Sequence, residues 1–190
     1  MTDKIQYVVA YAYSVHPGKT WAPLILKNKP EHLAGMLNLP GGKINPGEDP
    51  VAAALRELKE EAGLEEVQEF DPMAYLPSEY MGRIDTPHSI IHAVKVPVVF
   101  QKLNPGADET EKVDWYSIPE IYDLPNLMPN LRVIIPLMVK GIKNWVIQDF
   151  DSNWRKKAYH SVTFVMDDNP WNIQVRSVGH YAWGKKNENF

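Results

Sequence analysis

The 190-residue chain contains no cysteine, so disulfide bridges and thiolate metal sites are excluded from its fold and its chemistry. It also lacks any apolar run near the ~20 residues that a membrane span requires, and its first residues show no signal-peptide pattern. A serine-hydrolase elbow and a Walker phosphate loop are both missing. These absences predict a cytoplasmic protein that uses neither of those two catalytic designs and has no membrane partner.

A surplus of positive charge is missing as well. The formal net charge is −4, so the chain lacks the basic excess that binding to a nucleic-acid backbone requires. Hydrophobic residues make up 44% of the chain, which is enough for one compact domain with a substantial core. The composition therefore favours a globular protein that acts on a small molecule.

The most informative segment runs from Gly42 to Leu64. A loop rich in glycine and proline leads to an acidic N-cap candidate and to Pro50 near the first helical position. Residues 52–60 favour a helix, and Gly63 provides the expected stop. The apolar residues that share one side of this helix, and therefore face a core, are Val51, Ala54, Leu55, Leu58 and Ala62.

Three glutamates occupy the adjoining side of the same predicted helix. Glu57 and Glu61 are one turn apart, so both can reach one ion, and Glu60 lies beside them. Like charges at this spacing repel each other, and a hard divalent cation would relieve that repulsion. A solvated helix face with Arg56–Glu60 as a surface pair would explain the three glutamates, but not the loop glycines or Glu48.

The complete spacing is glycine, five residues, Glu48, seven residues, Arg-Glu-Leu, one residue, Glu-Glu, one residue, Gly-Leu. This pattern matches the Nudix box in full, and residues 1–145 resemble the Nudix hydrolase family. The resemblance implies that Glu57 and Glu61 are the principal metal ligands, with Glu60 as a further or water-mediated ligand. It also implies that the Gly42 carbonyl completes the coordination, and that Arg56 and Glu48 fix the loop and orient the ligands.

The implied cofactor is Mg²⁺, with Mn²⁺ as an alternative. Such ions neutralise the oxygens of a diphosphate, lower the pKa of a bound water and stabilise the leaving phosphate. The expected reaction is hydrolysis of a nucleoside diphosphate linked to a second group, with ADP-ribose-like or dinucleotide substrates first. Nucleoside triphosphates, including oxidised ones, come second, with release of pyrophosphate. A non-catalytic nucleotide-binding module and an RNA 5′-end decapping hydrolase are the remaining alternatives.

The general base has two candidate locations. One is the box itself, where Glu60 or Glu61 would be held within reach of the water. The other is an acidic loop before Trp115, in which Glu109 and Glu111 resemble the loop glutamates of many family members. An acidic surface turn would explain this loop equally well. The box glutamates are preferred.

Substrate contacts are predicted outside the box. Tyr80 lies sixteen residues beyond Leu64, where members that cleave dinucleoside polyphosphates tend to carry a tyrosine. Arg83 and Lys27 are candidates for contacts with phosphates, and an aromatic residue such as Tyr80, Trp21 or Trp115 could stack on a base.

The predicted fold class is α/β, a Nudix-type α/β/α sandwich with a mixed, curved sheet, as the resemblance also implies. Residues 1–150 form the predicted Nudix domain, and residues 151–190 a β-hairpin extension that packs on it or makes a contact in a homodimer. An aromatic wall for a base is the alternative use of this extension. The second main helix is expected over residues 129–144, where Pro136 should kink it or mark its true start. Strands are expected at residues 5–15, 21–26, 67–75, 89–100, 113–117, 158–166 and 172–183.

Overall fold

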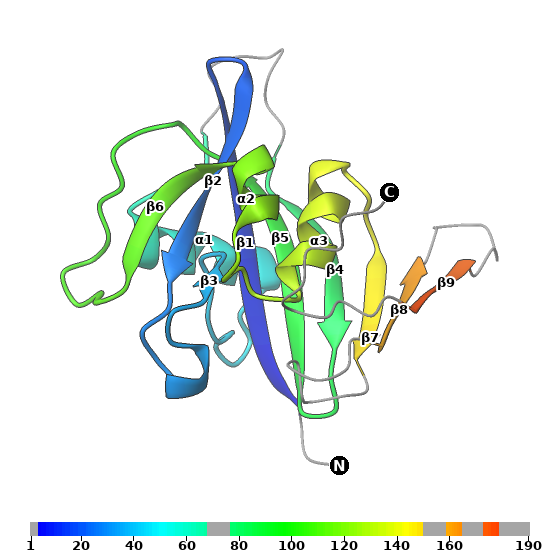
Figure 1. Ribbon diagram of the computed structural model, residues 1–190. Helices are drawn as coiled ribbons and strands as arrows, with labels where there is room; N and C mark the ends of the chain where they lie inside the picture. The colour runs from blue at the N-terminus through cyan, green and yellow to red at the C-terminus, as the bar shows by residue number, and fades with distance from the viewer. Residues whose placement is uncertain (1–3, 68–76, 150–158, 165–172, 179–190) are drawn as a thin grey trace.

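The computed structural model describes residues 4–67, 77–149, 159–164 and 173–178 (Figure 1). The strands are β1 Ile5–His16, β2 Lys19–Leu26, β3 Leu37–Asn38, β4 Glu79–Asp85, β5 Ser89–Pro97, β6 Lys112–Ser117, β7 Trp145–Asp149, β8 Tyr159–Phe164 and β9 Ile173–Val178. The helices are α1 Pro50–Ala62, α2 Ile118–Asp123 and α3 Leu131–Val139, with a short 3-10 turn at Glu31–Leu33.

The strands form a mixed sheet, as the sequence predicts. Its order is β3-β2-β1-β5-β4-β7-β8-β9, and β6 also pairs with β2. The pairs β1–β5 and β4–β7 are parallel, whereas the remaining pairs are antiparallel. The long β1 joins the two parts of the sheet, because its end pairs with β2 while most of its length pairs with β5.

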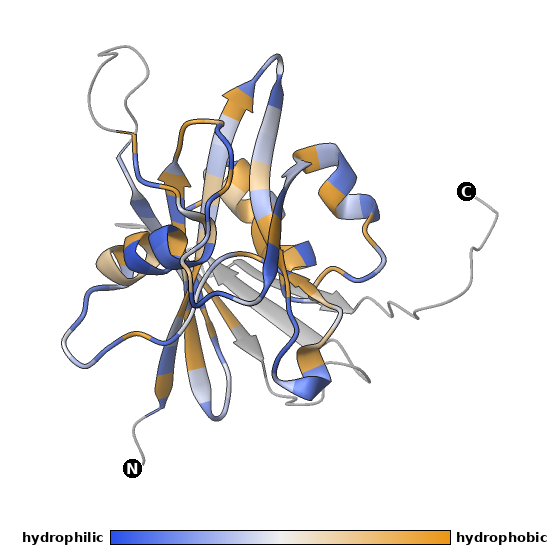
Figure 2. Ribbon diagram, turned by 90° about the vertical axis from the view of Figure 1, so that its left-hand side faces the viewer, coloured by the Kyte–Doolittle hydropathy of each residue, from blue (hydrophilic) through white to orange (hydrophobic). Residues whose placement is uncertain are grey.

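Helices cover both faces of this sheet, which confirms the predicted α/β/α sandwich. Successive residues of β1 point to opposite faces, so Val8 and Ala10 pack in the core under α1, while Val9 and Tyr11 pack in the core under α2 and α3. In Figure 1, α1 lies behind the sheet and the other two helices lie in front of it. Hydrophobic residues concentrate along the central strands, as Figure 2 shows.

Helix α1 begins and ends where the sequence predicts. Asp49 is the N-cap residue, and its side chain accepts a hydrogen bond from the Val51 N–H at 2.8 Å. Pro50 is the first helical residue. Gly63 ends the helix in the left-handed conformation, with φ of 66°. A side chain at Gly63 would collide with the Asn104 carbonyl, so the residue also allows a close approach of the next loop.

Strands β4 and β7 were not predicted, and they pair with each other; the two-residue β3 was not predicted either. The β4 sequence does not alternate regularly, because a bulge between Tyr80 and Gly82 shifts its register against β5. Trp145 of β7 is fully buried and packs directly on Gly82, where any side chain would overlap its ring. The sequence of β4 does not show the alternation typical of a strand, because a glycine and a bulge together interrupt the period of two. The strand predicted over residues 67–75 lies outside the described residues except for Val67, which is not in a strand.

The second helix is shorter than predicted. Helix α3 spans nine residues and Pro136 lies inside it, so the prediction that this proline marks the helix start is wrong. Gly141, with φ of 68°, follows its end and turns the chain towards β7. Residues 118–123 form the short helix α2, which begins with a capping box of Ser117 and Glu120.

The last two described strands fall inside the segments that the alternation predicts. β8 and β9 are antiparallel and continue the sheet from β7. The proposed boundary at residue 150 and the role of the extension stay predictions. None of the helices in the described ranges is long and apolar enough to cross a membrane.

Candidate active site

The loop before α1 is fixed on the edge of β1 by main-chain hydrogen bonds. The Val8 N–H donates to the Gly42 carbonyl at 2.9 Å, and the Ala10 N–H donates to the Pro40 carbonyl at 2.8 Å. Gly41 lies so close to β1 that an added Cβ would be 2.9 Å from the Cα of Val9. The loop therefore presents a rigid main chain to the helix, and the Gly42 carbonyl keeps one lone pair for a further partner.

Gly42 and Glu57 face each other across this loop. A Cβ at position 42 would stand 2.6 Å from the carboxyl carbon of Glu57, so the carboxylate occupies the space that a side chain would need. Burial raises the pKa of Glu57 despite its hydrogen bond with Arg56. This half-buried carboxylate lies beside the carbonyl with which, by resemblance, it would share a metal.

Arg56 connects the loop to the helix. Its Nε donates to Glu48 Oε1 at 2.8 Å and its Nη2 to Glu48 Oε2 at 3.0 Å, and Nη2 also donates to the Lys43 carbonyl at 3.1 Å. Its Nη1 donates to Glu57 at 2.8 Å and to Glu60 at 3.3 Å. Hydrogen bonding to Arg56 lowers the pKa of Glu48 to about 2. The guanidinium thus holds one glutamate of the loop and two of the helix at once.

Glu61 is the most enclosed of the box glutamates. Its side chain is only 9% exposed, and its Oε2 accepts the Gly41 N–H at 2.7 Å. Its Oε1 lies 3.9 Å from the Nζ of Lys27. Burial raises the pKa of Glu61 to about 7, although the Gly41 hydrogen bond and the Lys27 charge oppose this shift. Glu60 is different, because its side chain is 58% exposed.

The loop between β5 and β6 is attached to the end of α1. The N–H groups of Asn104 and Gly106 donate to the carbonyls of Ala62 and Glu60 at 3.0 and 2.8 Å. The same loop carries Glu109, whose charge acts on Glu61, and ends at Glu111. This attachment brings the predicted acidic loop to the box helix.

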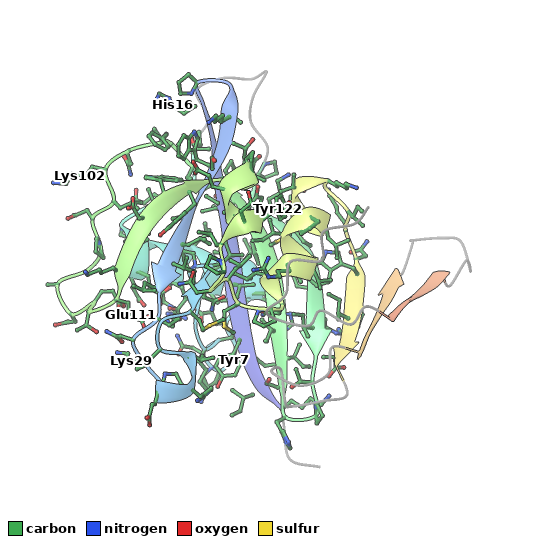
Figure 3. The ribbon with its side chains drawn as sticks, in the orientation of Figure 1. Tyr7, His16, Lys29, Lys102, Glu111 and Tyr122 are labelled. Carbon is green, nitrogen blue, oxygen red and sulfur yellow. The ribbon has the colours of Figure 1, made fainter. Side chains whose placement is uncertain are left out.

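Glu111 is buried and surrounded by donors. Its Oε2 pairs with the Lys27 ammonium, and its Oε1 accepts from the N–H groups of Asn28 at 2.7 Å and Lys29 at 3.4 Å. Figure 3 shows Glu111 beside Lys29 at the start of β6. Burial acts to raise the pKa of Glu111, but these donors outweigh it and the pKa is lowered. Its role as a general base stays a prediction.

Tyr80 and Arg83 lie together elsewhere on the sheet, on the face that α1 covers. The bulge in β4 turns both side chains to this face, opposite Val94 and His92 of β5. The Tyr80 hydroxyl lies 3.2 Å from His92 Nδ1, and His92 Nε2 lies 2.7 Å from Gln6 Oε1. Burial lowers the pKa of His92, and the nearby Arg83 charge adds to the effect. Their contacts, as far as the chain is described, are with this polar cluster rather than with the box glutamates.

The structure also places the two tryptophans considered for base stacking. Trp21 and Trp115 both pack against Phe100, with ring centroids 5.4 and 4.8 Å apart. The Trp115 indole N–H donates to the Gln101 carbonyl at 2.8 Å. Both rings therefore have protein partners in a cluster near the tip of the β1–β2 hairpin.

Sequence reasoning missed the N–H of Gly41 and the Lys27–Glu111 pair. The signal for Gly41 was present as a second glycine next to Gly42. Nothing in the local sequence links Lys27 to Glu111, which are 84 positions apart.

The candidate ligands are of the chemical type that a hard divalent cation prefers. Oxygen donors from Glu57, Glu60, Glu61 and the Gly42 carbonyl are the ligands that Mg²⁺ prefers. In the described residues, no three acidic or histidine side chains are already gathered closely enough to hold an ion. Because Gly42 has no side chain, there is space beside it. The Glu57 carboxylate, one of the ligands that the resemblance implies, fills that space. Arg56 donates to Oε1 of Glu57, so Oε2 of that carboxylate would face an ion without a change of position, and Glu61 is already fixed by Gly41.

Known proteins resemble most of this chain. The model of the NUDIX domain matches residues 11–138. A NUDIX hydrolase from Nitrosomonas europaea superposes with a TM-score of 0.55 at 16% identity, covering 78% of this chain and 81% of that one. The NUDIX domain of Shewanella oneidensis NrtR complexed with ADP ribose gives 0.54 at 17% identity, covering 74% and 90%. The MutT protein from Methanosarcina mazei Go1 gives 0.54 at 21% identity, covering 74% and 96%. No curated protein matches.

The chain therefore belongs to the NUDIX domain family, since the family model covers more than half of its residues. It is a hydrolase of pyrophosphate bonds, and members of this family generally use divalent metals such as Mg²⁺.

Mg²⁺ affinity is expected to depend on pH through Glu61. A carboxyl group with a pKa of about 7 is mostly protonated at lower pH, so Mg²⁺ must displace a proton there. Affinity should rise about tenfold per pH unit up to neutrality and then level off. Isothermal titration calorimetry in buffers of different ionisation enthalpy would count the released proton.

The stability of the metal-free protein should change in the opposite sense. The folded-state pKa of Glu61 is raised from 4.5 to about 7, so the native state binds the proton more tightly than the unfolded state. This contribution is fully present at acidic pH and is lost as pH rises to about 7. Glu61→Gln should flatten both profiles, and unchanged profiles in that variant would contradict the assignment.

Proposed function

We propose that the protein hydrolyses the diphosphate linkage of a nucleoside diphosphate joined to a second group, in a reaction that requires Mg²⁺ or Mn²⁺. ADP-ribose-like compounds and dinucleotides are the favoured substrates, and the products are a nucleoside monophosphate and the phosphorylated second group. The observation that carries the proposal is the fixed position of Glu57 and Glu61. Gly42 leaves room for the first, and the Gly41 N–H holds the second.

The roles of the box residues follow from their surroundings. Glu57 and Glu61 are half-buried or buried and held, so we assign metal binding to them. Glu60 is more exposed, and we assign it the role of accepting a proton from the attacking water. Arg56 and Glu48 orient the ligands by joining loop and helix. The protein needs to do little more than position the substrate and the water, because phosphoryl transfer relies mainly on alignment and charge neutralisation.

A cavity where the β5–β6 loop meets β6 supports a nucleotide-sized substrate. Its volume is about 470 Å³, and Glu111 lines it together with Leu24, Leu26, Leu103, Pro105, Lys112, Val113, Asp114 and Tyr116. Sites for small molecules commonly have this size and a mostly apolar lining with few polar groups. Its largely aliphatic walls suit the flat face of a base, and its Asp114 carboxylate suits a hydroxyl or amino donor.

The complex of the NrtR domain with ADP ribose adds support for the choice of substrate. That protein holds ADP ribose on the same fold. Lys27, Tyr80 and Arg83 stay our candidates for substrate contacts, of which Lys27 is the one beside the box helix.

The test is a product analysis with purified protein, Mg²⁺ and a substrate panel. The panel contains ADP-ribose, dinucleoside polyphosphates, nucleotide sugars, nucleoside triphosphates and capped RNA. We expect ADP-ribose to give AMP and ribose 5-phosphate, and oxygen-18 water to label only one of the two phosphates. Pyrophosphate from triphosphates as the dominant product would move the protein to the second substrate class. No turnover of any panel member with either cation would favour a binding module instead.

A further inference from the structure

Lys27 stands between two buried carboxylates that come from distant parts of the chain. It follows β2, and its main chain is fixed on both sides: its N–H donates to the Met36 carbonyl at 2.9 Å, and its carbonyl accepts the Gly35 N–H at 2.8 Å. Its side chain is 16% exposed, pairs with Glu111 and lies 3.9 Å from Glu61. One ammonium group thus serves the box helix and the β5–β6 loop together.

Each carboxylate uses its two oxygens for different partners. Glu61 gives Oε2 to the Gly41 N–H and turns Oε1 towards Lys27. Glu111 gives Oε1 to the N–H groups of Asn28 and Lys29 and Oε2 to Lys27. Main-chain donors therefore anchor both carboxylates, and the ammonium is shared between the two remaining oxygens. It lies much closer to Glu111 than to Glu61.

We infer that Lys27 and Glu111 form a positioning pair that sets the Mg²⁺ affinity of the box carboxylates, an inference that rests on the proposed function. The Lys27 ammonium competes with the cation for Glu61 Oε1. Glu111 limits this competition because it holds the ammonium at the far side. In this role Glu111 does not receive the proton from the water and does not ligate the metal.

The charges give the two single substitutions opposite effects. Lys27→Met removes a positive charge next to Glu61, so a cation should bind more tightly. Glu111→Gln keeps the side-chain shape but leaves Glu61 as the remaining partner of the ammonium, so a cation should bind more weakly. Removing both charges together leaves the net charge near Glu61 unchanged, so the Mg²⁺ affinity should stay close to that of the original protein. A purely structural contact would not produce shifts of opposite sign.

The experiment is calorimetric titration of the metal-free full-length protein with Mg²⁺ alone, without substrate. We expect about tenfold tighter binding for Lys27→Met, about tenfold weaker binding for Glu111→Gln, and near-original affinity for the double variant. Lys29→Met is the matched control, because that side chain is exposed and its contact with Glu111 is made by the main-chain N–H. Circular dichroism would show that each variant folds. If burial of the unpaired Glu111 carboxylate prevents Lys27→Met from folding, the comparison of Glu111→Gln with the double variant still tests the inference.

Four outcomes would overturn the inference. Shifts in the same direction would show that the pair acts only through folding. A double variant that binds as weakly as Glu111→Gln would make Glu111 a metal ligand. Binding of neither Mg²⁺ nor Mn²⁺ by the original protein would remove the basis of the proposed function as well. Metal binding with turnover of the substrate panel, but without opposite shifts, would contradict this inference alone.

Discussion

Glu61→Gln is expected to lower kcat by about 10³-fold or more while the protein stays folded. The substituted amide keeps the size of the side chain and can still accept the Gly41 N–H, so packing around it should survive. It loses the negative charge that a divalent cation requires from this buried position. The measurement is steady-state hydrolysis of the best substrate of the panel at saturating Mg²⁺, together with a thermal melt.

The matched control is Glu65→Gln, which changes a glutamate just beyond the same helix. Glu65 pairs with Lys59 on the surface, where its side chain is 69% exposed. Exposed pairs of this kind contribute little, so neither activity nor melting temperature should change appreciably. If Glu61→Gln retained activity close to that of the original protein, Glu61 would not be a metal ligand and the assigned roles of the box would have to be revised.

The box helix shows which parts of this fold its sequence determines locally. Its N-cap at Asp49, its proline start and its glycine stop are decided by contacts within a few residues, so the prediction agrees with the structure. The glutamate positions follow from helical period alone. Strands β4 and β7 could not be predicted from local sequence, because the glycine at position 82 is explained only by Trp145, a distant residue that packs on it.

The same division applies to the candidate site. Arg56 reaches Glu48, Glu57 and Glu60 from within the motif. The resemblance implies its link to Glu48, and helical spacing predicts its pair with Glu60, whereas its bond to Glu57 was not predicted. Lys27 was predicted to meet substrate phosphates, yet its position depends on the β5–β6 loop returning to the end of β2. Such a long-range ion pair leaves no periodic signal in the chain. Tyr80 and Arg83 share a face only because a bulge breaks the alternation of β4.

Gly42→Ala is expected to separate activity from stability. The added methyl group would enter the space that the Glu57 carboxylate occupies, 2.6 Å from its carboxyl carbon. A carboxylate at the end of a flexible side chain can move aside, so the free energy of unfolding should change by no more than about 1 kcal/mol. Its displacement would remove a principal ligand from beside the Gly42 carbonyl. Mg²⁺ affinity and kcat/KM should each fall by about 10²-fold.

Gly106→Ala provides the matched control for this substitution. Gly106 also lies against α1, but an added Cβ would be 3.2 Å from the Glu60 carbonyl oxygen and would not meet a ligand carboxylate. Calorimetric Mg²⁺ titration and urea unfolding of both variants should therefore show a loss of metal binding in Gly42→Ala alone, at similar stability. Normal Mg²⁺ binding by Gly42→Ala would mean that Glu57 does not need its present position to hold the ion. Because Gly42 lies directly beside the Glu57 carboxylate, that result would place the metal elsewhere on the helix.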